Sequence, residues 1–257
     1  MTIRISEGLA NMTAQGIGFA RALHRGYIDV RSGAQPANAD AAMTGTQLGI
    51  ITVSSLALTK ETRASATLEV TGGSGTLTGV TIGTLPIVVD PGLVVWATST
   101  TVTAALIRDA INRSGIARAT SSGAVVTVKA PPGVGTSWNG LALAAAGITC
   151  TGSNFASGVA GVNGLYLDQP AAGVIAKPAG VVWSCVGLAP GTAGWFRYFS
   201  SDTNDSGGLL TTLTEPLYAR LDGSCGVGTG DLQLSSLTFS LGSPHTVDSA
   251  SFTMPRS

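Results

Sequence analysis

The sequence predicts a mainly β fold: a β-sandwich or jelly-roll-like domain with an inserted small α+β domain and an N-terminal helix. Short runs of alternating or β-branched residues, separated by turn residues, recur along most of the 257-residue chain. Thirty-five glycines and eleven prolines can supply those turns. Because 44% of the residues are hydrophobic and only 11% are charged, a substantial core can form and long charged helices are not expected.

The chain carries equal numbers of basic and acidic residues, fourteen of each. A nucleic-acid-binding protein needs a basic face, so no nucleic-acid partner is expected. A net charge near zero favours association, which indicates a subunit of an assembly. No apolar run reaches the roughly 18 residues that a membrane span needs, and the N-terminus lacks a signal-peptide pattern. We therefore expect no membrane insertion, and synthesis and use in the cytosol or release by lysis.

Residues 1–25 are expected to be a helical docking segment. Ile5, Leu9 and Met12 recur at nearly helical spacing and predict a helix from about 6 to 15, with a second short helix after it. Isolated short helices are marginal in water, so a neighbour or another subunit should cover this stripe. The three apolar residues are therefore candidate interaction residues.

The next elements are two strands on either side of a loop. Residues 27–31 alternate in polarity and residues 47–53 are rich in β-branched side chains, so both predict strands. Residues 34–42 are small and polar, and Pro36 keeps them out of regular sheet.

The middle of the chain has a different composition. Residues 101–113 predict the clearest helix of the sequence, between strands expected at 66–71 and 124–130. Further strands are expected at 80–82 and 87–96. A strand, a helix and a strand with short links form a small α+β unit.

The two changes in composition define the expected domains. Residues 61–163 should be an inserted α+β domain, because the β-rich character of residues 26–60 returns at 164–257. Insertions at exposed loop tips are well tolerated, so the flanks should form one discontinuous β-sandwich domain.

The central strand of that domain is expected at 195–199. Side chains alternate along a strand, so Trp195, Arg197 and Phe199 share one face, and Phe196 and Tyr198 share the other. Apolar residues on both faces predict a strand that is covered on both sides, and the Arg197 head group then needs a partner. Other strands are expected at 181–186, 217–221, 232–234 and 247–254. The predicted core residues are Trp183, Trp195, Phe196 and Tyr198.

Three motif-bearing segments follow one another in the flanks. They are the strand and Gly-x-Gln-Pro loop of 26–42 with Gly-Thr-x-Leu at 45–48, Ala-Gly-Trp-Phe-Arg at 193–197, and Arg-Leu-Asp-Gly-Ser-Cys-Gly at 220–226 with 230–234 and 251–255. In order and spacing they resemble a family of small structural proteins of tailed bacteriophages. The insert departs from the short members of that family, where the first strands run directly into the later ones. Its helix and its Gly-Thr-Ser-Trp-Asn-Gly turn at 135–140 resemble a second phage module.

The resemblance implies a virion structural role without catalysis. The leading hypothesis is a minor capsid or decoration protein on the head surface, assembled in the host cytoplasm. Its partners would be copies of itself, in a trimer, and other virion proteins such as the major capsid protein, because closed symmetry is the default for homo-oligomers.

Two alternatives remain. The first is a tail-tip, baseplate or fibre-associated host-binding protein, in which Trp138 and Asn139 of a Gly-rich turn contact a neighbouring subunit or a host surface glycan. The second is an envelope-glycan hydrolase, which needs a pair of carboxylates or a nucleophile with a base. Asp205 and Glu215 could lie near each other, as residues of any hairpin can.

No residue pattern identifies a catalytic, cofactor or metal site. His24 and His245 are the only histidines and are expected to be structural. Residues 202–207 match the first half of a calcium loop but lack its closing glutamate, so a surface hairpin is the preferred interpretation. Cys150, Cys185 and Cys225 lack metal-ligand spacing and are expected to be free thiols.

Overall fold

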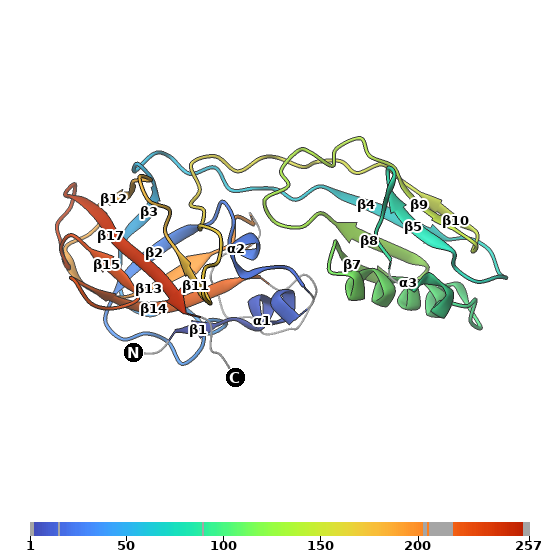
Figure 1. Cartoon of the computed structure of the whole chain (residues 1–257), viewed down its shortest axis with the longest axis horizontal. Coiled ribbons are helices and arrows are strands. Elements are labelled where there is room, and N and C mark those ends of the chain that lie inside the picture. Colours follow the sequence, from blue (N-terminus) through green and yellow to red (C-terminus); the bar gives the residue numbers. More distant parts are fainter. Residues whose placement is uncertain (1–2, 15, 89, 203–204, 206–217, 254–257) are drawn as a thin grey trace.

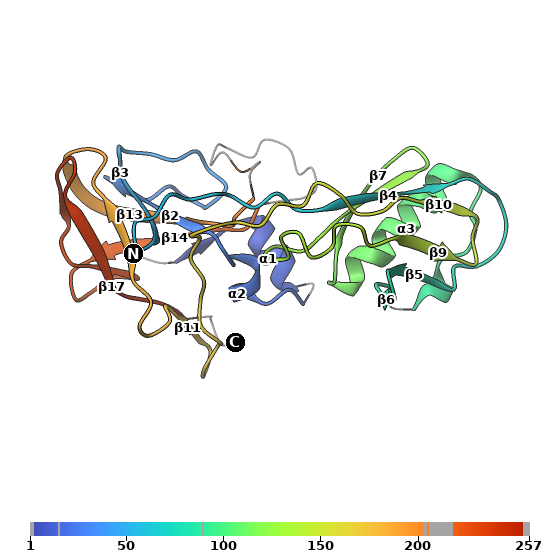
Figure 2. The ribbon, with the colours of Figure 1, turned by 90° about the horizontal axis from the view of Figure 1, so that it is seen from above.

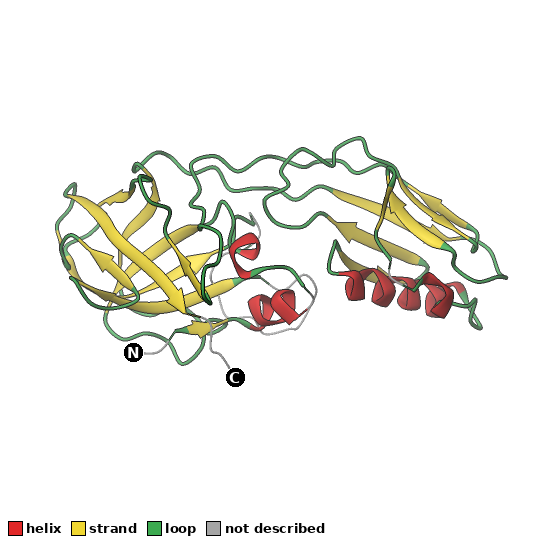
Figure 3. Cartoon of the chain, viewed as in Figure 1, coloured by secondary structure: helices red, strands yellow, loops and turns green. Residues whose placement is uncertain are grey.

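The computed structural model arranges the chain in two bodies that are both built on β-sheets (Figure 1). Of the described residues, 41% lie in strands and 13% in helices, so the expectation of a mainly β fold is confirmed. Within the described residues, the helices lie in the N-terminal segment and in the second body (Figure 3). The structure describes residues 3–14, 16–88, 90–202, 205 and 218–253.

The first body is a sheet that closes on itself. Within the described part of the chain its ring has seven strands, in the order β2 (Tyr27–Ser32), β3 (Gln47–Val53), β12 (Trp183–Val186), β17 (Pro244–Thr253), β15 (Leu232–Leu234), β14 (Arg220–Gly226) and β13 (Gly191–Phe199). The β13 strand pairs with both β14 and β2, which closes the ring. The short strands beside the ring are β1 (Arg4–Ile5), β11 (Val174–Ala176) and β16 (Thr238–Phe239). The ring is barrel-like, and the expected sandwich or jelly roll is not confirmed.

The second body lies within the insert, residues 61–163. One of its sheets has the order β10 (Cys150–Gly152), β4 (Ser65–Val70), β8 (Val125–Lys129) and β7 (Arg118–Ser122). The other has the order β6 (Leu85–Pro86), β5 (Gly79–Ile82) and β9 (Leu143–Ala146). Helix α3 (Thr100–Ser114) packs against β7 and β8 (Figure 1).

The predicted helix of the insert is confirmed, and its ends show why it forms there. The Ser99 hydroxyl accepts a hydrogen bond from the Val102 N–H at 3.2 Å, which satisfies one of the free donors of the first turn. Gly115 ends the helix in the left-handed region, at φ +69°, where a residue without Cβ is favoured.

Two strand predictions need correction. The strand expected at 87–96 is wrong, because Asp90 has a left-handed φ of 52° and Pro91 starts a short 3-10 helix, η1 (Pro91–Leu93). The strand expected at 217–221 begins at Arg220, as β14, and continues past the predicted end. The first residue of that prediction, Leu217, lies outside the described residues.

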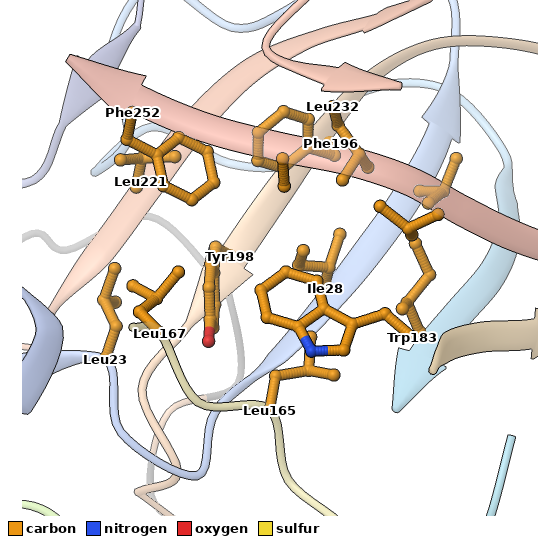
Figure 4. Close-up of a cluster of buried hydrophobic side chains, with 14 of the residues drawn as sticks. Leu23, Ile28, Leu165, Leu167, Trp183, Phe196, Tyr198, Leu221, Leu232 and Phe252 are labelled. Atoms are coloured by element: carbon orange, nitrogen blue, oxygen red, sulfur yellow. The ribbon is translucent and has the colours of Figure 1, made fainter. Parts of the chain in front are cut away.

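Each body has its own cluster of buried hydrophobic side chains. Figure 4 shows the cluster of the closed sheet, which includes Phe196 and in which Trp183 packs edge-on against Tyr198. Trp195 is also fully buried, on the opposite face of β13, so all four predicted core residues are inaccessible to water. The buried members of the second cluster lie between residues 64 and 155. The members of the first cluster lie outside residues 61–163, and the division into domains remains a prediction.

The two chain segments that connect the bodies run side by side (Figure 2). Isolated antiparallel bridges join Thr59 to Val162 and Thr62 to Val159, and a third joins Ser65 to Ala156. The two ends of the insert are therefore held together before the connecting segments reach the closed sheet.

The N-terminal segment is part of the closed-sheet body. Helix α1 (Glu7–Ala14) buries Leu9 and Met12 in the hydrophobic cluster of that body, and α2 (Phe19–Ala22) follows it. The Ser6 hydroxyl accepts hydrogen bonds from the N–H groups of Leu9 and Arg220, which ties α1 to β14. The prediction of a docking stripe is therefore corrected: Ile5 is 40% exposed, but Leu9 and Met12 pack on the chain's own core.

Candidate functional site

The outer face of β2, β13 and β14 carries a row of alternating charges. Arg197 on β13 lies opposite Asp29 on β2 and opposite Asp222 on β14. Asp222 in turn lies opposite Arg4 on β1. Neighbouring residues along each strand point to the other face, into the hydrophobic cluster, so these charges share the side away from the core.

Asp222 is the partner that Arg197 was predicted to need. Its Nε lies 2.6 Å from one carboxylate oxygen of Asp222 and its Nη2 lies 2.7 Å from the other. Both side chains are completely buried. Two parallel charge-assisted hydrogen bonds fix the guanidinium plane as well as its position.

Asp29 lies in a less favourable environment at the other end of the row. Its Oδ2 accepts hydrogen bonds from Arg31 at 3.1 Å and from Gln47 at 2.8 Å, while Oδ1 is buried and has no hydrogen-bond donor within the described structure. Burial raises the pKa of the Asp29 carboxyl, and the charges of Arg31 and Arg197 oppose that shift.

An aromatic row lies beside the charged row. The rings of Tyr27 and Phe199 are stacked, with centroids 4.8 Å apart. The guanidinium of Arg220 lies over Phe199, and Lys60 lies over Tyr27 at 4.8 Å from the ring centroid. Arg220 also binds the buried carboxylate of Asp205, with its Nε 3.0 Å from both oxygens. The outer face is therefore packed by stacked rings and cations.

Loop 33–46 covers this outer face and is held mainly through its backbone. Arg197 donates to the Ala41 carbonyl at 2.9 Å and Arg31 donates to the Gly45 carbonyl at 3.1 Å. Arg4 donates to the Pro36 carbonyl, and the Glu7 N–H donates to the Asp40 carboxylate at 2.8 Å. Side-chain donors from three strands therefore fix the path of the loop.

Glycines permit the loop to approach the sheet. A Cβ at Gly194 would lie 2.1 Å from the Gly33 carbonyl oxygen, so a larger residue there would push the loop away. Gly45 has φ +73°, and a Cβ there would lie 2.0 Å from the Ser32 carbonyl oxygen. Both positions belong to the motifs of the sequence analysis.

The three motif-bearing segments meet at this face. Loop 33–46 comes from the first segment, Arg197 from the second, and Asp222 from the third. Residues separated by more than 150 positions thus form one structural unit, because β13 pairs with both β2 and β14.

The turn that holds Trp138 and Asn139 is largely exposed, but both side chains have partners within the insert. Trp138 is half-buried and packs edge-on against Phe155, with ring centroids 5.1 Å apart. The Asn139 side chain donates to the Gly158 carbonyl and accepts from the Gly158 N–H, both at 2.9 Å. Trp138 therefore packs partly against the core of the insert, and its role as a contact residue stays a prediction.

Glu61 connects that same turn to the closed-sheet body. Its carboxylate accepts hydrogen bonds from the Gly133 and Gly135 N–H groups and from the Ser201 hydroxyl, all at 2.7 Å. The glutamate is 1% exposed. Sequence reasoning missed this residue, since nothing in a single glutamate indicates which distant N–H groups it will meet.

The possible calcium loop and carboxylate pair fall largely outside the described residues. Of residues 202–207, only Asp202 and Asp205 are described, and each pairs with an arginine: Asp202 with Arg63 at 2.9 Å, and Asp205 with Arg220. Glu215 is not among the described residues. Within the described ranges, no group of three or more histidines, cysteines, aspartates or glutamates is arranged to hold a metal ion.

The remaining candidate side chains have structural surroundings. His245 is stacked on Phe239 with centroids 3.7 Å apart, and its Nε2 lies 2.9 Å from the Ser243 hydroxyl. All three cysteines, which are described, are free. Burial raises the pKa of the Cys185 thiol to about 12, so that thiol stays protonated and unreactive at neutral pH.

No protein family, no curated protein and no solved structure matches the chain. Among the helices of the described residues, none has the length and apolar character required to cross a membrane.

Proposed function

We propose that the chain is a non-enzymatic structural protein of a tailed bacteriophage virion, a minor capsid or decoration protein that assembles as a trimer on the head. The observation that carries this proposal is the convergence of the three resembling segments on one face. A likeness spread over distant segments is more specific when their residues contact each other. Here Arg197 of the second segment binds Asp222 of the third and the backbone of the first.

Loop 33–46 is the attachment surface in this proposal. A buried ion pair costs desolvation and often contributes little net stability, and some such pairs serve to specify one conformation. The Arg197–Asp222 pair fixes a loop whose Ala37, Asn38 and Ala42 are exposed. A loop that is ordered before binding loses less entropy on association, which suits a subunit that attaches to a lattice.

The proposal replaces the docking role first given to the N-terminal helix. Leu9 and Met12 are occupied by the chain's own core, so they offer no surface to the major capsid protein. Loop 33–46 lies on the same body and is contacted by Arg4 and Glu7, so the N-terminal segment helps to hold the attachment surface in place.

A tail-tip, baseplate or fibre-associated host-binding protein is the second candidate. It is favoured by the separate core of the insert and by the two paired connecting segments, because the insert could then serve as a recognition module (Figure 2). The exposed Leu85, Leu93 and Val95 of the insert would supply contact area in that case.

Counting the copies of this chain in purified virions tests the proposal. A decoration protein is expected in hundreds of copies per particle, and light scattering of the purified protein should give the mass of a trimer. A few copies per particle would instead support the tail location. Particles that contain no copy would contradict a virion role altogether.

A further inference from the structure

A concave site lies where the connecting segments leave the closed sheet, away from loop 33–46. The cavity measures about 370 Å³, within the roughly 300–1,000 Å³ that is usual for small-molecule sites. Its lining comes from the end of the N-terminal segment, from β3 and from the returning connecting segment: His24, Arg25, Val53, Asn163, Gly164 and Tyr166.

The backbone around this cavity is strained at two places. Arg25 has φ 56° and Asn163 has φ 59°, a left-handed conformation that residues with a Cβ adopt infrequently. A Cβ at Gly164 would lie 2.0 Å from the Arg25 carbonyl oxygen, so the two strained segments are in direct contact. The Leu165 N–H donates to the Gly26 carbonyl at 2.7 Å and locks them together. Strained backbone conformations cluster at binding sites, where they hold side chains in the orientations that binding requires.

Two rings form one wall of the cavity. The centroids of His24 and Tyr166 lie 6.5 Å apart, and the ring planes are inclined by 48°. Tyr166 is 40% exposed and therefore presents part of its ring to a ligand. An aromatic ring offers an apolar face together with a polar tip, which suits the C–H face and hydroxyl edge of a sugar ring.

The lining also includes a cation, Arg25, and a polar amide, Asn163. Arg25 donates from Nη1 to the Gly161 carbonyl at 2.6 Å, which orients a guanidinium group that carries five N–H donors. Asn163 donates from its amide to the Ala57 carbonyl at 2.7 Å, so its side-chain oxygen can accept from a ligand hydroxyl. Burial, and then the charge of Arg25, lower the pKa of His24. This shift, which the charge of Glu61 opposes, favours the neutral imidazole, which has one donor and one acceptor nitrogen.

We propose that this cavity binds an acidic monosaccharide. The ring of the sugar packs on Tyr166, its carboxylate pairs with Arg25, and its hydroxyl groups bond to Asn163 and His24. A guanidinium fork matches a carboxylate in two parallel hydrogen bonds, and the aromatic wall selects a ring over a small anion. This binding activity goes beyond the proposed structural role and does not depend on it.

Amide NMR titration of the full chain with sodium glucuronate tests the proposal, with glucose and acetate as separate probes for the ring and the charge. We expect saturable shifts centred on His24, Arg25 and Tyr166, with an affinity for glucuronate at least about 10-fold above that for either probe. Equal affinity for acetate would reduce the site to a general anion contact and overturn the proposal. Failure of glucuronate to give saturable shifts would also overturn it.

Two variants and a matched control locate the binding. Tyr166→Ala and Arg25→Gln should each weaken glucuronate binding at least about 10-fold, whereas Arg21→Gln, at a nearby exposed cation outside the lining, should leave it nearly unchanged. Tyr166 is partly exposed, so its replacement tests the site even if Arg25→Gln does not fold. Unchanged affinity in Tyr166→Ala, with the native amide spectrum retained, would contradict the proposal.

Discussion

At the scale of single residues, Arg197 and Asp222 decide how loop 33–46 is presented. Their carboxylate and guanidinium groups are fully buried and bonded to each other in two places. A buried charge that loses its partner is far more costly than a pair removed together. This difference allows the stability of the barrel and the order of the loop to be measured separately.

Replacing Arg197 by Met should lower the free energy of unfolding by about 3–5 kcal/mol, because Asp222 then remains buried and charged without its main partner. The double variant Arg197→Met with Asp222→Leu should recover most of that loss in urea denaturation. It should still show faster thermolysin cleavage within loop 33–46, since the bond to the Ala41 carbonyl is gone. A double variant as unstable as the single one would show that the pair itself stabilises the fold.

Asp29 gives a pH dependence with a defined sign. Burial raises the pKa of its carboxyl above the ordinary value of 3.8, and Arg31, Gln47 and Arg197 oppose the shift without cancelling it. The folded state therefore binds this proton more tightly than the unfolded state does. The contribution of Asp29 to stability is then greatest below pH 3.8 and falls as pH rises through the raised pKa.

The comparison to make is wild type against Asp29→Asn, in urea unfolding at several pH values between 3 and 7. The free energy of unfolding of wild type minus that of the variant should decrease as pH rises, because only the wild type loses the proton. A difference that increases with pH would mean that Arg31 and Gln47 outweigh the burial of this carboxyl.

At the scale of elements, local periodicity predicted most helices and strands, but it could not predict which strands pair. The strand at 195–199 and the helix at 101–113 follow from side-chain alternation and apolar spacing, and both are confirmed within one or a few residues. The strand at 87–96 failed because its apolar residues resemble a strand, while Asp90 and Pro91 turn the chain.

The sequence could predict that a buried charged residue needs a partner, but not which residue that partner is. The sequence shows that Arg197 needs a partner, but Asp222 lies 25 positions away and is selected by the register between β13 and β14. A shift of one residue in that register would have put Leu221 or Gly223 in its place. The cavity at Arg25 and Tyr166 was not predictable for the same reason, since it depends on where the insert returns to the sheet.

Helix α1 yields a prediction that separates core packing from docking. Leu9→Ala should lower the free energy of unfolding by about 2–5 kcal/mol, because the Leu9 side chain is fully buried. Ile5→Ala is the matched control, and its 40% exposure limits the expected change to about 0.5 kcal/mol. Thermal melting of the two variants shows whether Leu9 contributes to the core. A Leu9→Ala protein that is stable but no longer assembles would instead support the docking role.

At the scale of the whole molecule, the closed sheet should fold without most of the insert. Its flanks are far apart in sequence, but the entropy of loop closure grows only with the logarithm of loop length. The paired connecting segments already hold the ends of the insert together at Ser65 and Ala156, which exchange two backbone hydrogen bonds. To replace the rest of the insert, the chain therefore needs only a short turn between Ser65 and Ala156.

Joining Ser65 to Ala156 through an Asn-Gly turn, in place of residues 66–155, should therefore give a folded barrel. The variant should also carry Glu61→Gln, because the deletion removes the Gly133 and Gly135 donors of that buried carboxylate. Cooperative melting by circular dichroism, with the strand signal of the closed sheet, is the expected result. An unfolded product would show that the two bodies depend on each other.

The most direct test of the proposed virion role is attachment to particles that lack this chain. Purified wild-type protein and Ser74→Arg, a change in an exposed loop of the insert, should bind such particles to the same occupancy. Ala37→Arg, which introduces the same side chain on exposed loop 33–46, should fold normally and fail to bind, because it places a long charged side chain on the attachment surface. Quantitative mass spectrometry of the washed particles gives the occupancy. Full occupancy by Ala37→Arg would contradict the assignment of loop 33–46, and no binding by the wild type would contradict the proposed head location.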